Sequence, residues 1–164
     1  MAAPLGINAK MYYRSAGSYN SPTWTELNIV SDLTVSPEWE KAEVGSRASR
    51  IMKQVKTRLG LTFAGRFLKK PGNTQYETLM NALVSDEVLD LLILDGDRAT
   101  EHVRGWRADC QLFSGTEDQN MTSALYVDFS IEPTDSDNEP KVVKVAAGGI
   151  LQYSTPGVNG ATFA

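Results

Sequence analysis

Apolar and polar residues alternate along several stretches of the chain, with the period of two that is typical of half-buried β-strands. The clearest stretch is 58–68, where Leu59, Leu61, Phe63 and Phe67 alternate with small, polar or charged residues. Weaker alternation of the same kind predicts four more strands, over 8–14, 32–40, 106–112 and 125–131.

One further strand is predicted to be buried on both of its faces. Residues 88–94 are apolar at nearly every position, which is typical of a strand in the middle of a sheet. Pro37 lies inside the alternating stretch 32–40, and because proline cannot donate a backbone hydrogen bond, that strand is expected at an edge or with a bulge.

A single helix is predicted after the Pro71-Gly72 pair. Thr74 and Glu77 have the spacing of a capping box, in which the threonine hydroxyl and the carboxylate satisfy free amides at a helix start. One apolar stripe at helical spacing follows, made of Tyr76, Leu79, Met80 and Leu83. The predicted fold class is therefore mainly β, a sandwich or barrel-like sheet with one flanking α-helix.

Two segments do not fit this sheet pattern. Residues 41–56 show little apolar periodicity and are predicted to form a long loop, and loops of this length are usually functional. Residues 144–164 are rich in glycine yet retain Ile150, Leu151 and Phe163, so they are predicted to form a C-terminal arm that docks on a neighbouring subunit. The β domain is assigned to 1–143.

Charge is distributed very unevenly along the chain. The net charge is −4, but residues 41–70 carry nine Lys or Arg against Glu43 alone, a net +8 that the rest of the chain balances with −12. Such a chain can associate with copies of itself through opposite charges. The basic residues of the predicted loop are Lys41, Arg47, Arg50, Lys53 and Lys56.

Three interpretations of this basic loop remain open: a contact between subunits, a solvated surface, or a phosphate site for nucleic acid. No aromatic residue or histidine lies between Lys41 and Lys56. Recognition of single strands by stacking on aromatic rings is therefore disfavoured.

The sequence offers little support for catalysis, a cofactor or a metal. The only cysteine is Cys110, and the only histidine, His102, follows Glu101 in a polar turn that also contains Asp95 and Asp97. This turn is interpreted as an ordinary hairpin connection, since its spacing does not complete a calcium loop. No segment has the length of a membrane span and the start of the chain lacks signal-peptide features, so a cytoplasmic site of synthesis is expected.

Several short motifs, in order, resemble a known family. Residues 23–27 and 30–35, which read TWTEL and VSDLTV, resemble the opening segment of a phage major tail tube protein family. Residues 92–97 and 105–109 resemble its middle, and 129–134 its final strand. The order of the motifs is more specific than any one of them. Residues 43–48 match the family's loop only in part, and nothing beyond Lys144 has a counterpart.

The resemblance implies a non-enzymatic virion protein that assembles in the host cytoplasm. Hexameric rings would stack into the tail tube, whose lumen conducts DNA during ejection without binding it specifically. The implied partners are copies of the chain itself, the tape measure protein, a tail terminator and baseplate or distal tail proteins, with no membrane. The long loop would reach an adjacent ring. A tube of a secretion or contractile injection apparatus is the first alternative, and a monomeric β-barrel that binds a ligand or nucleic acid is the second.

A conduit for DNA should have a polar bore that repels phosphates. The polar faces of the predicted strands supply the candidates, although exposure to outside solvent is an equally good explanation for some of them. Arg58 and Arg66 do not fit a purely acidic bore. The lumen candidates are Asp32, Ser36, Glu38, Glu40, Asp109, Gln111, Asp128, Ser130 and Glu132.

Overall fold

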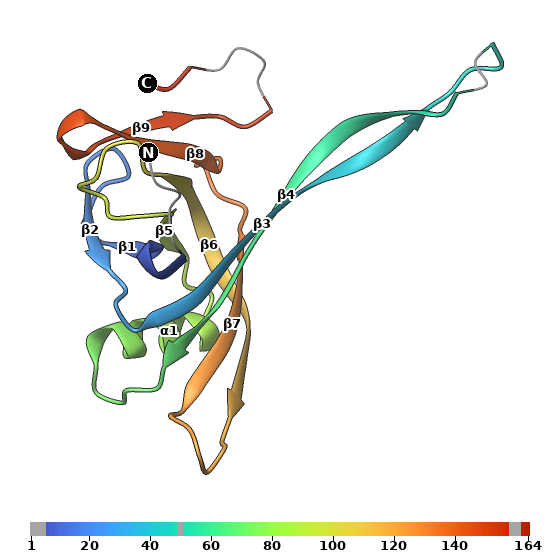
Figure 1. Cartoon of the computed structure of the whole chain (residues 1–164). Coiled ribbons are helices and arrows are strands. Elements are labelled where there is room, and N and C mark those ends of the chain that lie inside the picture. The colour runs from blue at the N-terminus through green and yellow to red at the C-terminus, as the bar shows by residue number, and fades with distance from the viewer. Residues whose placement is uncertain (1–5, 49–50, 158–161) are drawn as a thin grey trace.

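A curled antiparallel sheet and one helix form the body of the protein, and a long two-stranded ribbon projects from it (Figure 1). The computed structural model describes residues 6–48, 51–157 and 162–164. Its elements are η1 (Gly6–Asn8), β1 (Lys10–Gly17), β2 (Pro22–Glu26), β3 (Val30–Val44), β4 (Lys53–Leu68), α1 (Thr74–Val84), β5 (Leu89–Leu94), β6 (Arg104–Asp118), β7 (Tyr126–Pro133), β8 (Lys141–Ala146), η2 (Ala147–Gly149) and β9 (Ile150–Ser154).

The strands follow the order β2-β1-β5-β6-β7-β4-β3, and β8 and β9 extend the sheet from β6. The long strand β6 has different neighbours along its length. Its first half pairs with β5 on one side and β8 on the other, whereas its second half pairs with β7. The mainly β fold with one flanking helix agrees with the sequence prediction, and β3 lies at the edge of the sheet, as Pro37 indicated.

Two hydrophobic cores lie on opposite faces of the central strand β5. The main core fills the curl of the sheet beneath α1, and the second core lies between β1, β5 and the β8–β9 hairpin. Alternate residues of β5 enter the two cores: Leu91 and Ile93 the main one, Leu92 and Leu94 the second. This confirms the prediction of a central strand buried on both faces, and it explains why residues 89–94 lack polar alternation.

The predicted helix is present, but its cap lies one residue earlier than expected. Asn73 is the N-cap, and its side-chain oxygen accepts hydrogen bonds from the backbone amides of Gln75 and Tyr76. Glu77 accepts instead from the backbone amide of Gly72 at 3.0 Å. Asparagine caps a helix as well as threonine does. A side-chain cap is therefore present as predicted, but at Asn73 and not at Thr74. Tyr76 and Leu79 are buried against the sheet.

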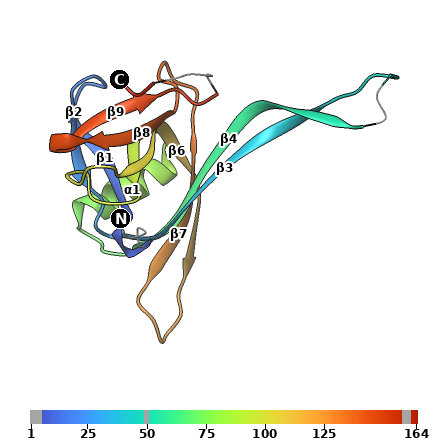
Figure 2. The same ribbon diagram turned by 45° about the horizontal axis from the view of Figure 1, so that its top comes forward.

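The predicted loop over 41–56 is wrong in its extent. Strand β3 continues to Val44 and β4 begins at Lys53, with paired residues from Lys41–Lys56 outward to Val44–Lys53. This outer part of the β3–β4 ribbon (residues 41–56) projects beyond the body and buries neither face (Figures 1 and 2). Apolar alternation reports burial of one face, so a ribbon exposed on both faces lacks the pattern that would reveal its strands.

The division at residue 143 is also wrong, because it falls inside strand β8. Val143 and Val145 are fully buried in the second core, and β8 pairs with the first half of β6. Strand β9 then pairs with β8, and the backbone of Tyr153 exchanges two hydrogen bonds with Ala164. Residues 141–154 are therefore part of the subunit's own sheet, since their valines complete a core that β5 begins.

Candidate assembly surfaces

One face of the β3-β4-β7-β6 part of the sheet is polar over a large area. The residues opposite one another in register, such as Ser36 with Thr62 and Ser130 with Ser114, lie on the side that faces away from the main core. Most of them are exposed or half-buried. This surface is called the polar face below, and it is made of Thr34, Ser36, Glu38, Thr62, Ala64, Arg66, Ser114, Thr116, Asp128, Ser130 and Glu132.

The two arginines that did not fit an acidic bore are paired with carboxylates. Arg66 Nε lies 3.1 Å from Asp128 Oδ1 and 3.6 Å from Asp32 Oδ2. Arg58 Nε lies 3.9 Å from Glu40 Oε2. All of these side chains are substantially exposed, so each pair adds little stability, but each arginine's charge is neutralised locally.

Among the predicted lumen residues, Asp109 is placed differently from the others. It is only 7% exposed and accepts a hydrogen bond from the side-chain amide of Asn138 at 2.8 Å. The connection between β7 and β8 covers it, so it is not available to a bore. The half-buried Gln111 donates to the carbonyl of Asp86 and accepts from the Thr134 hydroxyl.

The outer ribbon carries the basic residues that the sequence singled out. Lys41, Lys53 and Lys56 lie in its paired strands, and Arg47 lies in the connection between them; all four are exposed. Arg50 lies outside the described residues. Lys56 Nζ stacks 5.3 Å from the centre of the Trp39 ring at the base of the ribbon. Val44, Met52 and Val55 are also exposed there.

Within the described ranges, the outermost strands of the body's β3-β4-β7-β6 sheet each lack a neighbour on one side. Strand β3 pairs with β4 alone, and β6 beyond Cys110 pairs with β7 alone, because β5 ends opposite Cys110. Exposed strand edges present free backbone donors and acceptors, which are a template for another strand. The polar face thus runs between two edges that are free to pair.

The buried pair Asp90–Arg107 was not singled out by sequence. Both Nε and Nη2 of Arg107 donate to the Asp90 carboxylate, at 3.0 and 2.7 Å, and Arg14 donates to it from the other side. The Arg107 guanidinium stacks 3.7 Å from the Tyr19 ring and donates to the Tyr153 hydroxyl. This cluster ties the β1–β2 connection, β5, β6 and β9 together.

The polar turn after β5 has structural contacts rather than a catalytic arrangement. Asp95 accepts from the amide of Arg104, and Asp97 accepts from the amide of Ala99 and from Lys10 Nζ at 2.7 Å. His102 Nε2 lies 3.8 Å from Glu101, with both side chains about half exposed. In the part of the chain that the structure describes, no three His, Cys, Asp or Glu residues are placed to hold a metal. No helix there is long and apolar enough to cross a membrane.

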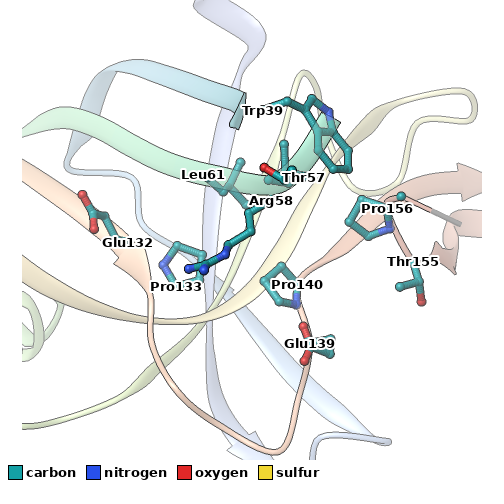
Figure 3. Close-up of a pocket in the computed structure, with 13 residues that line it drawn as sticks. Trp39, Thr57, Arg58, Leu61, Glu132, Pro133, Glu139, Pro140, Thr155 and Pro156 are labelled. Carbon is teal, nitrogen blue, oxygen red and sulfur yellow. The ribbon is translucent and has the colours of Figure 1, made fainter. Parts of the chain in front are cut away.

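A groove of about 660 Å³ lies where the base of the ribbon meets the C-terminal residues (Figure 3). Trp39 and Pro156 form one part of its wall, and Arg58, Glu132 and Glu139 line the rest.

The fold has been seen before in tail and tube assemblies. The tail of an empty gene transfer agent particle, solved with C6 symmetry, contains a chain that matches with a TM-score of 0.64 at 11% identity, over 82% of this chain and 96% of that one. The SPP1 tail tube matches with a TM-score of 0.63 at 8% identity, over 79% and 75%.

A sheath-tube complex of an extracellular contractile injection system matches with a TM-score of 0.56 at 11% identity, over 89% of this chain and 88% of that one. No family model matches the sequence, and no curated protein matches it. The structural matches show that the chain has the fold of subunits from these tail and tube assemblies.

Proposed function

We propose that this chain is the major tail tube protein of a tailed phage or a related prophage element, a structural virion protein whose rings stack into a hollow tube that conducts DNA. The likeness of the fold to tail and tube subunits over about four fifths of the chain carries the proposal. It is supported by the two free edges of the β3-β4-β7-β6 sheet, which suit a subunit that completes its sheet with copies of itself.

In the proposed ring, β3 of one copy pairs with the free half of β6 of the next. The four strands of each copy then join one continuous barrel, with the polar face turned inward. Six copies per ring is the number that the C6 symmetry of the matched tail suggests. The remaining lumen candidates carry an excess of negative charge that would keep DNA phosphates from adhering, and they are Asp32, Ser36, Glu38, Glu40, Gln111, Asp128, Ser130 and Glu132.

The outer ribbon is proposed to contact the adjacent ring through Lys41, Arg47, Arg50, Lys53 and Lys56. An isolated two-stranded ribbon is marginally stable in water, so its projecting part gains from a partner that covers it. Tail terminator, tape measure and baseplate proteins are the further partners proposed, in a virion tail assembled in the host cytoplasm.

The proposal is tested by negative-stain electron microscopy of the purified full-length chain. Rings or hollow filaments are expected, and light scattering should show particles far larger than the 18.0 kDa chain. A chain that stays monomeric at high concentration, even with its own tail partners present, would overturn the proposal.

A second candidate function is the inner tube of a contractile injection apparatus. It is favoured by the matches to contractile injection system assemblies, whose TM-scores of 0.54 and 0.56 are lower than those of the gene transfer agent and SPP1 tails. The two candidates differ in their partners. Co-expression with a sheath protein encoded beside this chain should yield sheathed tubes only for a contractile system.

A further inference from the structure

An apolar groove of about 370 Å³ lies beside the free edge of β3. Leu33 and Val35 of β3 form one wall, and Ile93 and Trp106 of the central strands form the other. Ala9 also lines the groove. These side chains belong to the side of the sheet that faces the main core, so the groove is an opening in the flank of that core.

An exposed aromatic residue lies at the other free edge of the same sheet. Phe113 is 60% exposed and lies in a bulge of β6 between Leu112 and Ser114. Bulges redirect side chains at sheet edges, and this one inserts Phe113 next to Leu112, whose side chain is buried in the main core. The phenyl ring therefore projects from the part of β6 that β5 leaves uncovered.

The groove and Phe113 are thus at opposite edges of one four-stranded sheet. We propose that Phe113 of one copy inserts into this groove of the next copy. The inference rests on the proposed ring, because pairing of β3 with the free half of β6 is what brings the two features together.

A second copy is the favoured occupant, since the same chain supplies an apolar projection at one edge and an apolar cavity at the other. Such a contact is heterologous and repeats around a ring until it closes. Burying a phenylalanine ring removes much apolar surface from water, which favours association. Because the ring enters the groove in only one alignment of the two strands, the contact would also select the register in which β3 and β6 pair.

Cross-linking of two single-cysteine additions tests the contact. Phe113→Cys and Ala9→Cys chains, the second carrying a size tag, are mixed under assembly conditions and treated with a short bismaleimide. A tagged–untagged dimer is expected from the mixture. The double variant Phe113→Cys with Ala9→Cys should give a ladder up to the ring size. The native Cys110 is fully buried and gives little background.

Met121→Cys is the matched control, because Met121 is fully exposed on the same β6–β7 hairpin but lies at its tip. Mixed with Ala9→Cys, it should give no dimer. Tubes that form normally while the Phe113→Cys and Ala9→Cys pair gives no cross-link would overturn this contact alone. A chain that never assembles would overturn the ring and this contact together.

Substitutions of Phe113 measure how much its side chain contributes to assembly. Phe113→Asp should raise the protein concentration needed for assembly about tenfold or more, whereas Phe113→Leu should stay close to the unaltered chain. Met121→Asp is the control for adding a charge. Equal assembly of Phe113→Asp and the unaltered chain, with equal thermal melting by circular dichroism, contradicts the inference.

Discussion

Asp90 shows how a single residue can escape prediction. It lies inside the apolar run of residues 89–94, where a carboxylate has no obvious partner in sequence. Its partners Arg14 and Arg107 come from β1 and β6, and only the folded sheet brings them to it. Both members of the Asp90–Arg107 pair are almost completely buried, with side chains 1% and 3% exposed.

Replacing Asp90 should therefore be strongly destabilising. Asp90→Ala leaves the Arg107 charge buried without its partner, and breaking such a pair costs about 3–5 kcal/mol. Urea denaturation followed by circular dichroism measures this loss. Asp128→Ala, which breaks the exposed pair with Arg66, is the control and should cost no more than about 1 kcal/mol. Similar costs for the two variants would contradict the structural role given to Asp90.

Asp97 should make stability depend on pH. The hydrogen bond from Lys10, and then that from the Ala99 amide, lower the pKa of the Asp97 carboxyl below its ordinary value of 3.8. A carboxyl whose pKa is lower in the folded chain stabilises it above the unfolded value, and this contribution is lost as pH falls through the folded pKa.

The free energy of unfolding of Asp97→Asn should therefore be lower than that of the unaltered chain at pH 7. The difference should shrink as the pH drops below about 4, where Asp97 of the unfolded chain takes up a proton, and it should disappear once the folded carboxyl, whose pKa is lower, is also protonated. Urea denaturation at several pH values measures it. A difference that stays constant from pH 7 to pH 3 would show that the charge of Asp97 is not the cause.

Among the elements, the sequence predicted those that bury one face. Strands β4 and β7 alternate, and helix α1 carries an apolar stripe, because the main core lies on one side of each. Strand β6 was predicted from its core-facing residues, although Arg107 and Asp109 on its other face are buried too. Strands β2, β8 and β9 were missed. For β2 and β9 the reason is that they are half-buried over most of their length, which leaves no clear apolar face. The outer ribbon was taken for a loop for a related reason: neither of its faces is buried.

The outer ribbon can be removed without touching either core. Residues 42–55 lie beyond the Lys41–Lys56 pair, so replacing them with Asn-Gly should close a shorter hairpin and leave the thermal melting point within a few degrees of the unaltered chain. Tube formation, observed by negative-stain microscopy, should be lost if the ribbon joins adjacent rings.

Lys53→Glu with Lys56→Glu is the matched variant that keeps the ribbon and reverses part of its charge. If rings of this variant stack more weakly, the positive charges of Lys53 and Lys56 contribute to the contact between rings. If the shortened chain forms normal tubes, the outer ribbon does not make the contact between adjacent rings. A salt-sensitive gel shift with DNA that both variants lose would instead favour a phosphate site.

On the scale of the whole molecule, the candidate lumen could be predicted only in part. Alternation placed Asp128, Ser130 and Glu38 on the polar face because each strand's other side enters the core. It could not distinguish Asp109, which lies on the same side of β6 as Gln111 but is covered by the β7–β8 connection. Coverage by a distant segment is a tertiary property that periodicity does not report.

The β3–β4 ribbon and the β6–β7 hairpin leave the body in different directions (Figures 1 and 2). A polymer built by stacking such subunits has two unlike ends, one displaying basic ribbons and the other a different surface. Addition and loss of rings would then proceed with separate rate constants at the two ends. A partner that recognises one end of such a polymer would therefore need a different surface to recognise the other.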